Sequence, residues 1–247
     1  MKQPRILLYR TGETAAEVVR DVGNYREWFS RVVGDRASLE PHMAWEMPHA
    51  DHREHDAIII TGSPLSLVSP APWMEDACAF VRGAAAAGKA ILGVCFGHQL
   101  VGRAFGGSVR KNPRGWEAGT HEVHLTDEGK RDPLFAGMPD SLRVNQSHMD
   151  EVDALGPATV RLAGGGHSEN QAIAVGDHVR GVQFHPEMNG TVIRRVIENR
   201  KRILTDDAHA TGRATTHDAV TLLSRAADTP DAERVVLNFV ERFAARA

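Results

Sequence analysis

In the N-terminal part of the chain, short apolar runs typical of buried strands alternate with segments that have the pattern of helices. Uninterrupted apolar runs at residues 6–9, 58–60 and 90–94 are short, as expected for strands that are covered on both faces. A helix is expected between the first two runs, and a second begins at Pro72 and ends before Gly88. This alternation predicts an α/β fold with a doubly wound, mostly parallel sheet and helices on both of its faces.

The pattern changes after Gly107, where short β-like segments are separated by Gly, Pro, Asp and Asn. These segments predict an antiparallel extension of the sheet. They lie at residues 108–112, 120–126, 158–163 and 171–184.

The C-terminal part is predicted to be helical from Thr191, where apolar residues again recur at helical spacing. Thr229 is expected to cap a last helix, and the polar segment 205–214 is expected to form a loop. We therefore expect a main domain at residues 1–200 and a C-terminal helical extension at residues 201–247 that packs on the same domain.

Composition narrows the class of protein. The 247 residues carry a formal net charge of -3 with neutral histidines, so no global positive field favours nucleic acid. The N-terminus lacks the apolar core of a signal peptide, and no apolar run is long enough to span a membrane. The two cysteines, Cys78 and Cys95, are a poor basis for a disulfide framework. A cytoplasmic protein that binds neither nucleic acid nor membranes is expected.

Cys95 lies between two glycines, where the strand at residues 90–94 passes directly into a helical pattern. A Gly-x-Cys-x-Gly element in this position resembles a nucleophile elbow, a strained turn that pushes a reactive side chain into a cleft. The N-terminus of the following helix favours the thiolate over the thiol. The alternative, a buried cysteine that only fills space, is the commoner role for a lone cysteine.

The segment GVQFHPE at residues 181–187 ends a β-rich run with a histidine and a carboxylate. In an extended chain, residues two apart face the same way, so His185 and Glu187 are expected to project into one cleft. They would supply a base for Cys95 and a group that orients the base. A His-Pro-Glu tripeptide alone is weak evidence, but together with the cysteine elbow it predicts a catalytic triad.

The segments GVCFGHQ at 93–99 and GVQFHPE at 181–187 resemble the signature pair of the class I glutamine amidotransferases. TGSP at 61–64, GWEAG at 115–119 and QSHMDEV at 146–152 are similar to further segments of that family. The resemblance is closest to the stand-alone branch related to the amidotransferase domain of GMP synthetase, and it implies a flavodoxin-like fold.

The resemblance also implies roles for individual residues. Cys95 would be the nucleophile, His185 the general base and acid, and Glu187 the orienting carboxylate. Gly62 and Phe96 would donate backbone N–H groups to an oxyanion hole. The residues expected to contact the substrate are Gln99, Ser147, His148 and Met149. Two readings of His148 stay open, because it would either line the glutamine pocket or be a packed histidine, with Asp150 capping a turn.

No metal or cofactor is expected. The three histidines His49, His52 and His55 lie in a charged segment before a strand, where a solvated loop is the better interpretation. His121 and His124 do not have the spacing of a helical metal motif, and on a strand they would face opposite sides. The glycines at residues 164–166 are expected to form a flexible turn rather than an anion site.

The predicted activity is hydrolysis of the γ-amide of glutamine to glutamate and ammonia through a cysteinyl thioester. The residues after Glu187 hold no nucleotide-binding signature, so ammonia would pass to a separate synthetase or be released. A stand-alone γ-glutamyl peptidase is an alternative enzyme. A non-catalytic binding or regulatory module is an alternative of another class, and the intact triad argues against it.

Overall fold

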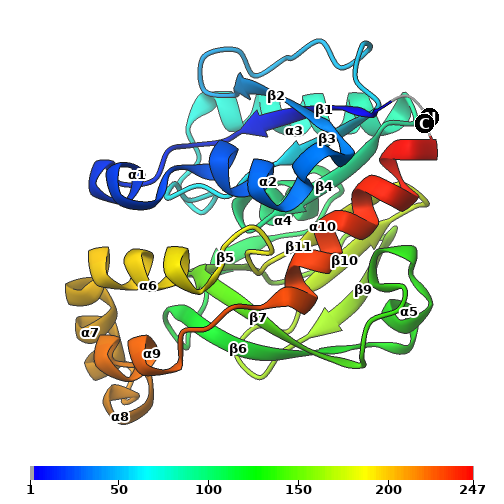
Figure 1. Ribbon diagram of the computed structural model, residues 1–247. Coiled ribbons are helices and arrows are strands. Elements are labelled where there is room, and N and C mark those ends of the chain that lie inside the picture. The colour runs from blue at the N-terminus through cyan, green and yellow to red at the C-terminus, as the bar shows by residue number, and fades with distance from the viewer. Residues whose placement is uncertain (1–2, 247) are drawn as a thin grey trace.

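A nine-stranded mixed sheet forms the centre of the protein, in the order β2-β1-β3-β4-β11-β10-β9-β6-β7. The computed structural model describes residues 3–246 (Figure 1). Neighbouring strands from β2 to β11 are parallel, and all pairs from β11 to β7 are antiparallel. The predicted parallel sheet with an antiparallel extension is therefore confirmed.

The parallel strands are β1 (Arg5–Arg10), β2 (Ser38–Met43), β3 (Ala57–Ile60), β4 (Ala90–Val94) and β11 (Val179–Val182). The antiparallel half contains β6 (Glu117–Leu125), β7 (Ser141–His148), β9 (Thr159–Gly164) and β10 (Ala172–Val175). A separate two-stranded antiparallel sheet pairs β5 (Val109–Lys111) with β8 (Asp150–Val152).

Helices cover both faces of the sheet, as Figure 1 shows. Those packed on one face are α1 (Ala16–Val22), α2 (Tyr25–Val33), α6 (Gly190–Asn199) and α10 (Pro230–Arg242). Those on the other face are α3 (Pro72–Ala86) and α4 (Phe96–Ala104). The remaining helices are α5 (Asp127–Arg131), α7 (Lys201–Ala210), α8 (Ala214–His217) and α9 (Ala219–Arg225).

The alternation of side chains along the buried strands divides the core into two layers. In β1, Ile6 and Leu8 belong to the layer beneath α2 and α10, whereas Leu7 and Tyr9 belong to the layer beneath α3 and α4. All residues of β3 and β4 are buried, which explains their uninterrupted apolar sequence.

Two predictions for the C-terminal part are wrong. Most of the segment expected to be a loop is helix α7, because Leu204 and Ala208, four residues apart, are buried on one face and anchor it. The side chain of Thr229 does not cap α10, and its hydroxyl instead lies 3.4 Å from the amide nitrogen of Asn145.

Strands β2, β7 and β8 lie outside the segments predicted from the sequence to be strands. The edge strand β2 has the sequence SLEPHM and is only partly buried, so it has no continuous apolar run. It pairs in parallel with β1 along its full length. Polar residues and a proline are tolerated at an edge because one side of the strand has no ladder partner.

The C-terminal helices join the rest of the chain at several points. Helix α10 contacts α2 and β7, and Glu233 on α10 forms an ion pair with Arg31 on α2 at 2.6 Å. The backbone N–H of Trp116 donates to Asp207 on α7 at 2.9 Å. The division of the chain at residue 200 stays a prediction. Within residues 3–246, no helix is both long and apolar enough to cross a membrane.

Candidate active site

Cys95 occupies a strained turn between β4 and α4. Its φ of 53° is the only positive φ of a non-glycine residue within residues 3–246. Such a conformation costs free energy and persists only where the surroundings enforce it. Here the N–H of Cys95 donates to Val182 on β11 at 2.9 Å, and its C=O accepts from Gln99 at 3.1 Å. The elbow predicted from the sequence is therefore present.

The two glycines beside Cys95 allow the helix to approach the sheet closely. A Cβ on Gly93 would lie 2.3 Å from the carbonyl oxygen of Gly97, and a Cβ on Gly97 would lie 2.4 Å from the carbonyl oxygen of Ile60. Both contacts are with backbone atoms, which cannot move aside as a flexible side chain can. The Gly-x-Cys-x-Gly pattern thus has a packing reason at each glycine.

His185 and Glu187 follow the neighbouring strand β11 and form a buried pair. The ring nitrogen Nδ1 of His185 lies 2.7 Å from Oε1 of Glu187, and both side chains are almost fully buried. An extended chain was expected here, but residues 186 and 187 form a turn. Asn145 holds this turn: its C=O accepts from the His185 N–H at 2.8 Å, and its side chain donates to Met188 at 2.8 Å.

Burial and charge act in opposite directions on His185. Burial lowers the pKa of the imidazole, but the negative charges of Glu187 and Cys95 outweigh it and raise the pKa of His185 to about 10. The proton is therefore held on His185 at neutral pH. Oε2 of Glu187 is buried without a hydrogen-bond partner within residues 3–246, so the contact with His185 is the main one that this carboxylate makes.

Gly62 lies directly against His185, since a Cβ there would be 2.8 Å from Cε1 of the ring. The peptide that carries the Gly62 N–H is held by Thr11, whose hydroxyl donates to the carbonyl oxygen of Thr61 at 2.9 Å. Phe96 is the first residue of α4, where backbone N–H groups have no partner inside the helix. Both predicted oxyanion residues thus adjoin Cys95 or His185.

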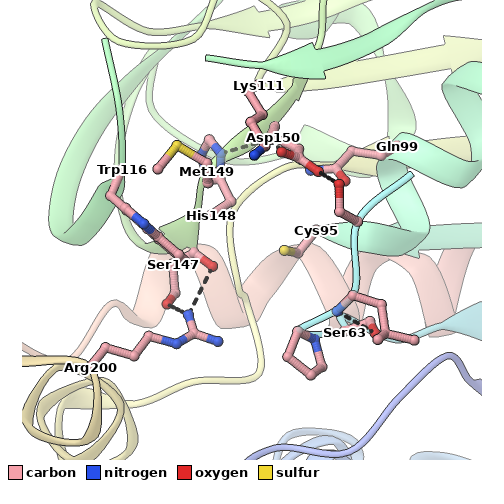
Figure 2. Close-up of a pocket in the computed structure, with 13 residues that line it drawn as sticks. Ser63, Cys95, Gln99, Lys111, Trp116, Ser147, His148, Met149, Asp150 and Arg200 are labelled. Atoms are coloured by element: carbon pink, nitrogen blue, oxygen red, sulfur yellow. Dashed lines mark hydrogen bonds between the residues drawn. The ribbon is translucent and has the colours of Figure 1, made fainter. Parts of the chain in front are cut away.

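A cavity of about 190 Å³ opens in front of Cys95. In Figure 2 the Cys95 sulfur points into the space between Ser63 and Arg200. Gln99 and the segment from Ser147 to Met149, which were the predicted substrate contacts, line this cavity. Gln99 donates to the carbonyl oxygen of Asp150 at 2.8 Å and to Gln183 at 3.2 Å, so its amide is already oriented.

The structure combines the two readings of His148. The residue lines the cavity, yet it is buried, with Nε2 3.0 Å from Glu117 and Nδ1 3.0 Å from the carbonyl oxygen of Asp150. Asp150 does not cap a turn, because its carboxylate accepts from the hydroxyl of Ser66. Glu117 also accepts from Gln171 at 2.8 Å.

Several residues of the site were not identified from the sequence. Lys111, Trp116 and Arg200 line the cavity, and they come from three separate segments of the chain. The buried Tyr25 on α2 lies beside Gly62, and burial raises the pKa of its hydroxyl well above the usual range. The GWEAG resemblance covered Trp116, but nothing in the spacing linked Arg200 or Tyr25 to Cys95.

The histidines near the N-terminus do not converge. His49 lies 3.8 Å from Asp76, His55 lies 3.1 Å from Glu40, and His52 packs against Phe80. No cluster of three or more metal-ligating side chains suited to a metal ion is found within residues 3–246.

A cysteine on a strained turn at the end of a strand, beside a histidine held by a carboxylate, is the arrangement of a cysteine-dependent hydrolase. The chain belongs to the class-I glutamine amidotransferase family, whose model matches residues 19–203. Members of this family are cysteine-dependent amide hydrolases, so the predicted family and enzyme class are confirmed.

The similar proteins include both a peptidase and a subunit of GMP synthase. The chain is 28% identical to gamma-glutamyl peptidase 5 of Arabidopsis thaliana over 203 residues, which is 80% of this chain and 81% of that protein. It is 30% identical to a glutamine-hydrolysing GMP synthase subunit of Ignicoccus hospitalis over 181 residues, which is 70% of this chain and 89% of that protein.

A solved structure of a glutamine amidotransferase from Thermotoga maritima matches with a TM-score of 0.72 at 22% identity and covers 100% of both chains. This match shows that the two proteins share the same fold, which confirms the predicted flavodoxin-like α/β class.

Proposed function

We propose that the protein hydrolyses the γ-amide bond of glutamine or of a related γ-glutamyl compound, with Cys95 as nucleophile. The observation that carries this proposal is the strained Cys95 beside the buried His185 and Glu187 pair, in front of a cavity. Membership of the class-I glutamine amidotransferase family supports the same chemistry.

In the first step, the Cys95 thiolate attacks the γ-carbonyl carbon and forms a carbon–sulfur bond. The carbon–nitrogen bond then breaks, and His185 gives its proton to the departing amine. A protonated His185 suits this role, because the raised pKa keeps the proton available at neutral pH. The product is a thioester between Cys95 and the γ-carbon of the glutamyl group.

In the second step, water attacks the thioester carbon and gives one proton to His185. The carbon–sulfur bond breaks, which restores the Cys95 thiolate and the protonated imidazole. Glutamate leaves as the acid and ionises in water. During both steps, negative charge develops on the former carbonyl oxygen, and we assign its stabilisation to the backbone N–H groups of Gly62 and Phe96.

A second candidate function is the supply of ammonia to a separate synthetase. It is supported by the similarity to the GMP synthase relative from Ignicoccus hospitalis, which is itself named as one subunit of that enzyme. The similarity to gamma-glutamyl peptidase 5 instead supports release of an amine directly to solvent. We also propose a reducing compartment such as the cytoplasm, because the chemistry requires Cys95 outside a disulfide and both cysteines are free.

The test is glutamate release by the purified protein, measured in parallel with glutamine and with a γ-glutamyl dipeptide. Hydrolysis of glutamine supports the amidotransferase-like function, and hydrolysis of the dipeptide alone supports the peptidase. Absence of glutamate release from both substrates contradicts the proposal for the isolated chain.

A further inference from the structure

Arg200 places a positive charge inside the cavity that contains Cys95. Its guanidinium lies over the ring of Trp116, with the guanidinium carbon 5.0 Å from the ring centroid, and it donates to the hydroxyl and the carbonyl oxygen of Ser147 (Figure 2). The backbone at the junction of α6 and α7 holds the residue, because its N–H donates to Val196 and its C=O accepts from Leu204.

In the described part of the chain, this charge has no acidic partner. Among residues 3–246, no carboxylate lies within 4.0 Å of its side chain, and the ionisable groups that act on its pKa are Tyr25 and Cys95. By contrast, the buried Arg180 lies 2.9 Å from Asp132. Partly burying a guanidinium without a carboxylate is costly unless a ligand completes its hydrogen bonds. Arg200 is therefore suited to bind a carboxylate that the substrate brings.

The other end of the cavity holds a second cation together with a carboxylate. Lys111 on β5 pairs directly with Asp150 on β8, so their side chains share one face of the small sheet. Both residues line the cavity. An ammonium and a carboxylate side by side complement the α-carboxylate and α-ammonium that every γ-glutamyl compound carries.

The two ends lie on opposite sides of the reacting centre. Arg200 contacts Ser147 near the end of β7, whereas Asp150 begins β8 of the small sheet after a bend at Met149. Cys95 lies between them in Figure 2. If Lys111 and Asp150 hold the α-end of the glutamyl group, its γ-carbonyl reaches Cys95 and the leaving group extends toward Arg200.

Glutamine has one carboxylate, whereas the cavity offers two cations. We propose that Arg200 binds a carboxylate on the leaving group, so that the preferred substrates are γ-glutamyl peptides whose leaving amino acid has a free α-carboxylate. This inference rests on the proposed γ-glutamyl amide hydrolysis and adds the substrate class and the residue that selects it.

The test compares three substrates with the full-length protein: glutamine, γ-glutamyl-glycine and γ-glutamyl-glycinamide. The two dipeptides differ only in the carboxylate, which the amide neutralises. We expect kcat/KM for γ-glutamyl-glycine to exceed that for the glycinamide by about tenfold to a hundredfold, as for a hydrogen-bonded ion pair. This comparison needs no variant.

Substitution then assigns the preference to Arg200. In Arg200→Met, the ratio of kcat/KM for γ-glutamyl-glycine to kcat/KM for the glycinamide should fall to about one. Arg200→Lys should retain part of the preference, because it keeps the charge but loses the planar stack on Trp116. Arg202→Met is the matched control, since Arg202 lies outside the cavity with an exposed side chain.

The possible outcomes test the substrate preference, the role of Arg200 and the proposed function separately. Equal kcat/KM for the two dipeptides in the parent overturns the inference while leaving the proposed function intact. A preference that survives in Arg200→Met, or a loss of equal size on all three substrates, overturns the assignment to Arg200. Hydrolysis of none of the three substrates by the parent overturns the proposed function and the inference with it.

Discussion

Replacing Glu187 with glutamine should move the alkaline limit of activity to lower pH. The carboxylate lies 2.7 Å from the His185 ring and is buried with it. The substitution keeps the size of the side chain but removes the charge that favours the imidazolium. Burial, which lowers the pKa of His185, is then opposed mainly by Cys95.

The short distance between His185 and Glu187 sets the size of the expected change in the His185 pKa. Unit charges 2.7 Å apart at an effective dielectric constant of about 20 attract one another by about 6 kcal/mol. The rise of the His185 pKa from 6.5 to about 10 corresponds to about 5 kcal/mol in favour of the protonated ring. Because a glutamine still accepts a hydrogen bond, we expect the pKa to fall by about 2–4 rather than by the full electrostatic amount.

The assay is the pH profile of kcat/KM for glutamate release, from about pH 6 to about pH 11, because this ratio reports the ionisation of the free enzyme. The parent should lose activity as the pH rises through about 10, where His185 releases its proton. Glu187→Gln should lose activity between about pH 6 and pH 8. Glu198→Gln, which changes an exposed carboxylate, is the control. An unchanged alkaline limit in Glu187→Gln would show that the Glu187 charge does not hold the proton on His185.

The stability of the parent protein should also fall as the pH rises. The pKa of His185 is raised on folding, so its contribution is complete below about pH 6.5 and is lost as the pH rises through about 10. Over this range, the thermal unfolding temperature of the parent should fall by more than that of Glu187→Gln, and an equal fall in the two proteins would contradict the linkage.

Two further predictions concern residues beside the triad. Iodoacetamide at neutral pH should alkylate Cys95 and spare Cys78, because Cys78 is buried outside the cavity and burial raises its pKa to about 11. Equal labelling of the two cysteines in the folded protein contradicts this prediction. Gly97→Ala should destabilise the protein by about 1–3 kcal/mol, because the new Cβ meets a backbone oxygen at 2.4 Å. Gly83→Ala, on an open face of α3, should be neutral or stabilising. Urea unfolding measures the stability of both variants, and equal stability contradicts the packing argument.

The sequence predicted the elements that bury a continuous apolar run or follow a helical stripe. Strands β3 and β4 and helix α3 belong to this group, and so does the turn at Cys95. The edge strand β2 was missed because half-exposed polar residues give no such signal. Helix α7 was missed because only Leu204 and Ala208 anchor it, and their spacing was outweighed by the polar residues between them.

The site was predictable only where its residues lie in recognisable segments. Cys95, His185 and the wall from Ser147 to Met149 fall in such segments, and the structure places them around one cavity or beside it. Arg200 lies at a helix junction, and its meeting with Ser147 and Trp116 depends on how α6 and α7 pack. Contacts of this kind arise from tertiary packing, which no local pattern encodes.

Whether Cys95 attacks a γ-glutamyl amide is decided by measuring glutamate release with the parent, Cys95→Ala and Cys78→Ala proteins side by side. We expect release by the parent and by Cys78→Ala, and none by a folded Cys95→Ala. Release by Cys95→Ala at the rate of the parent would contradict this expectation.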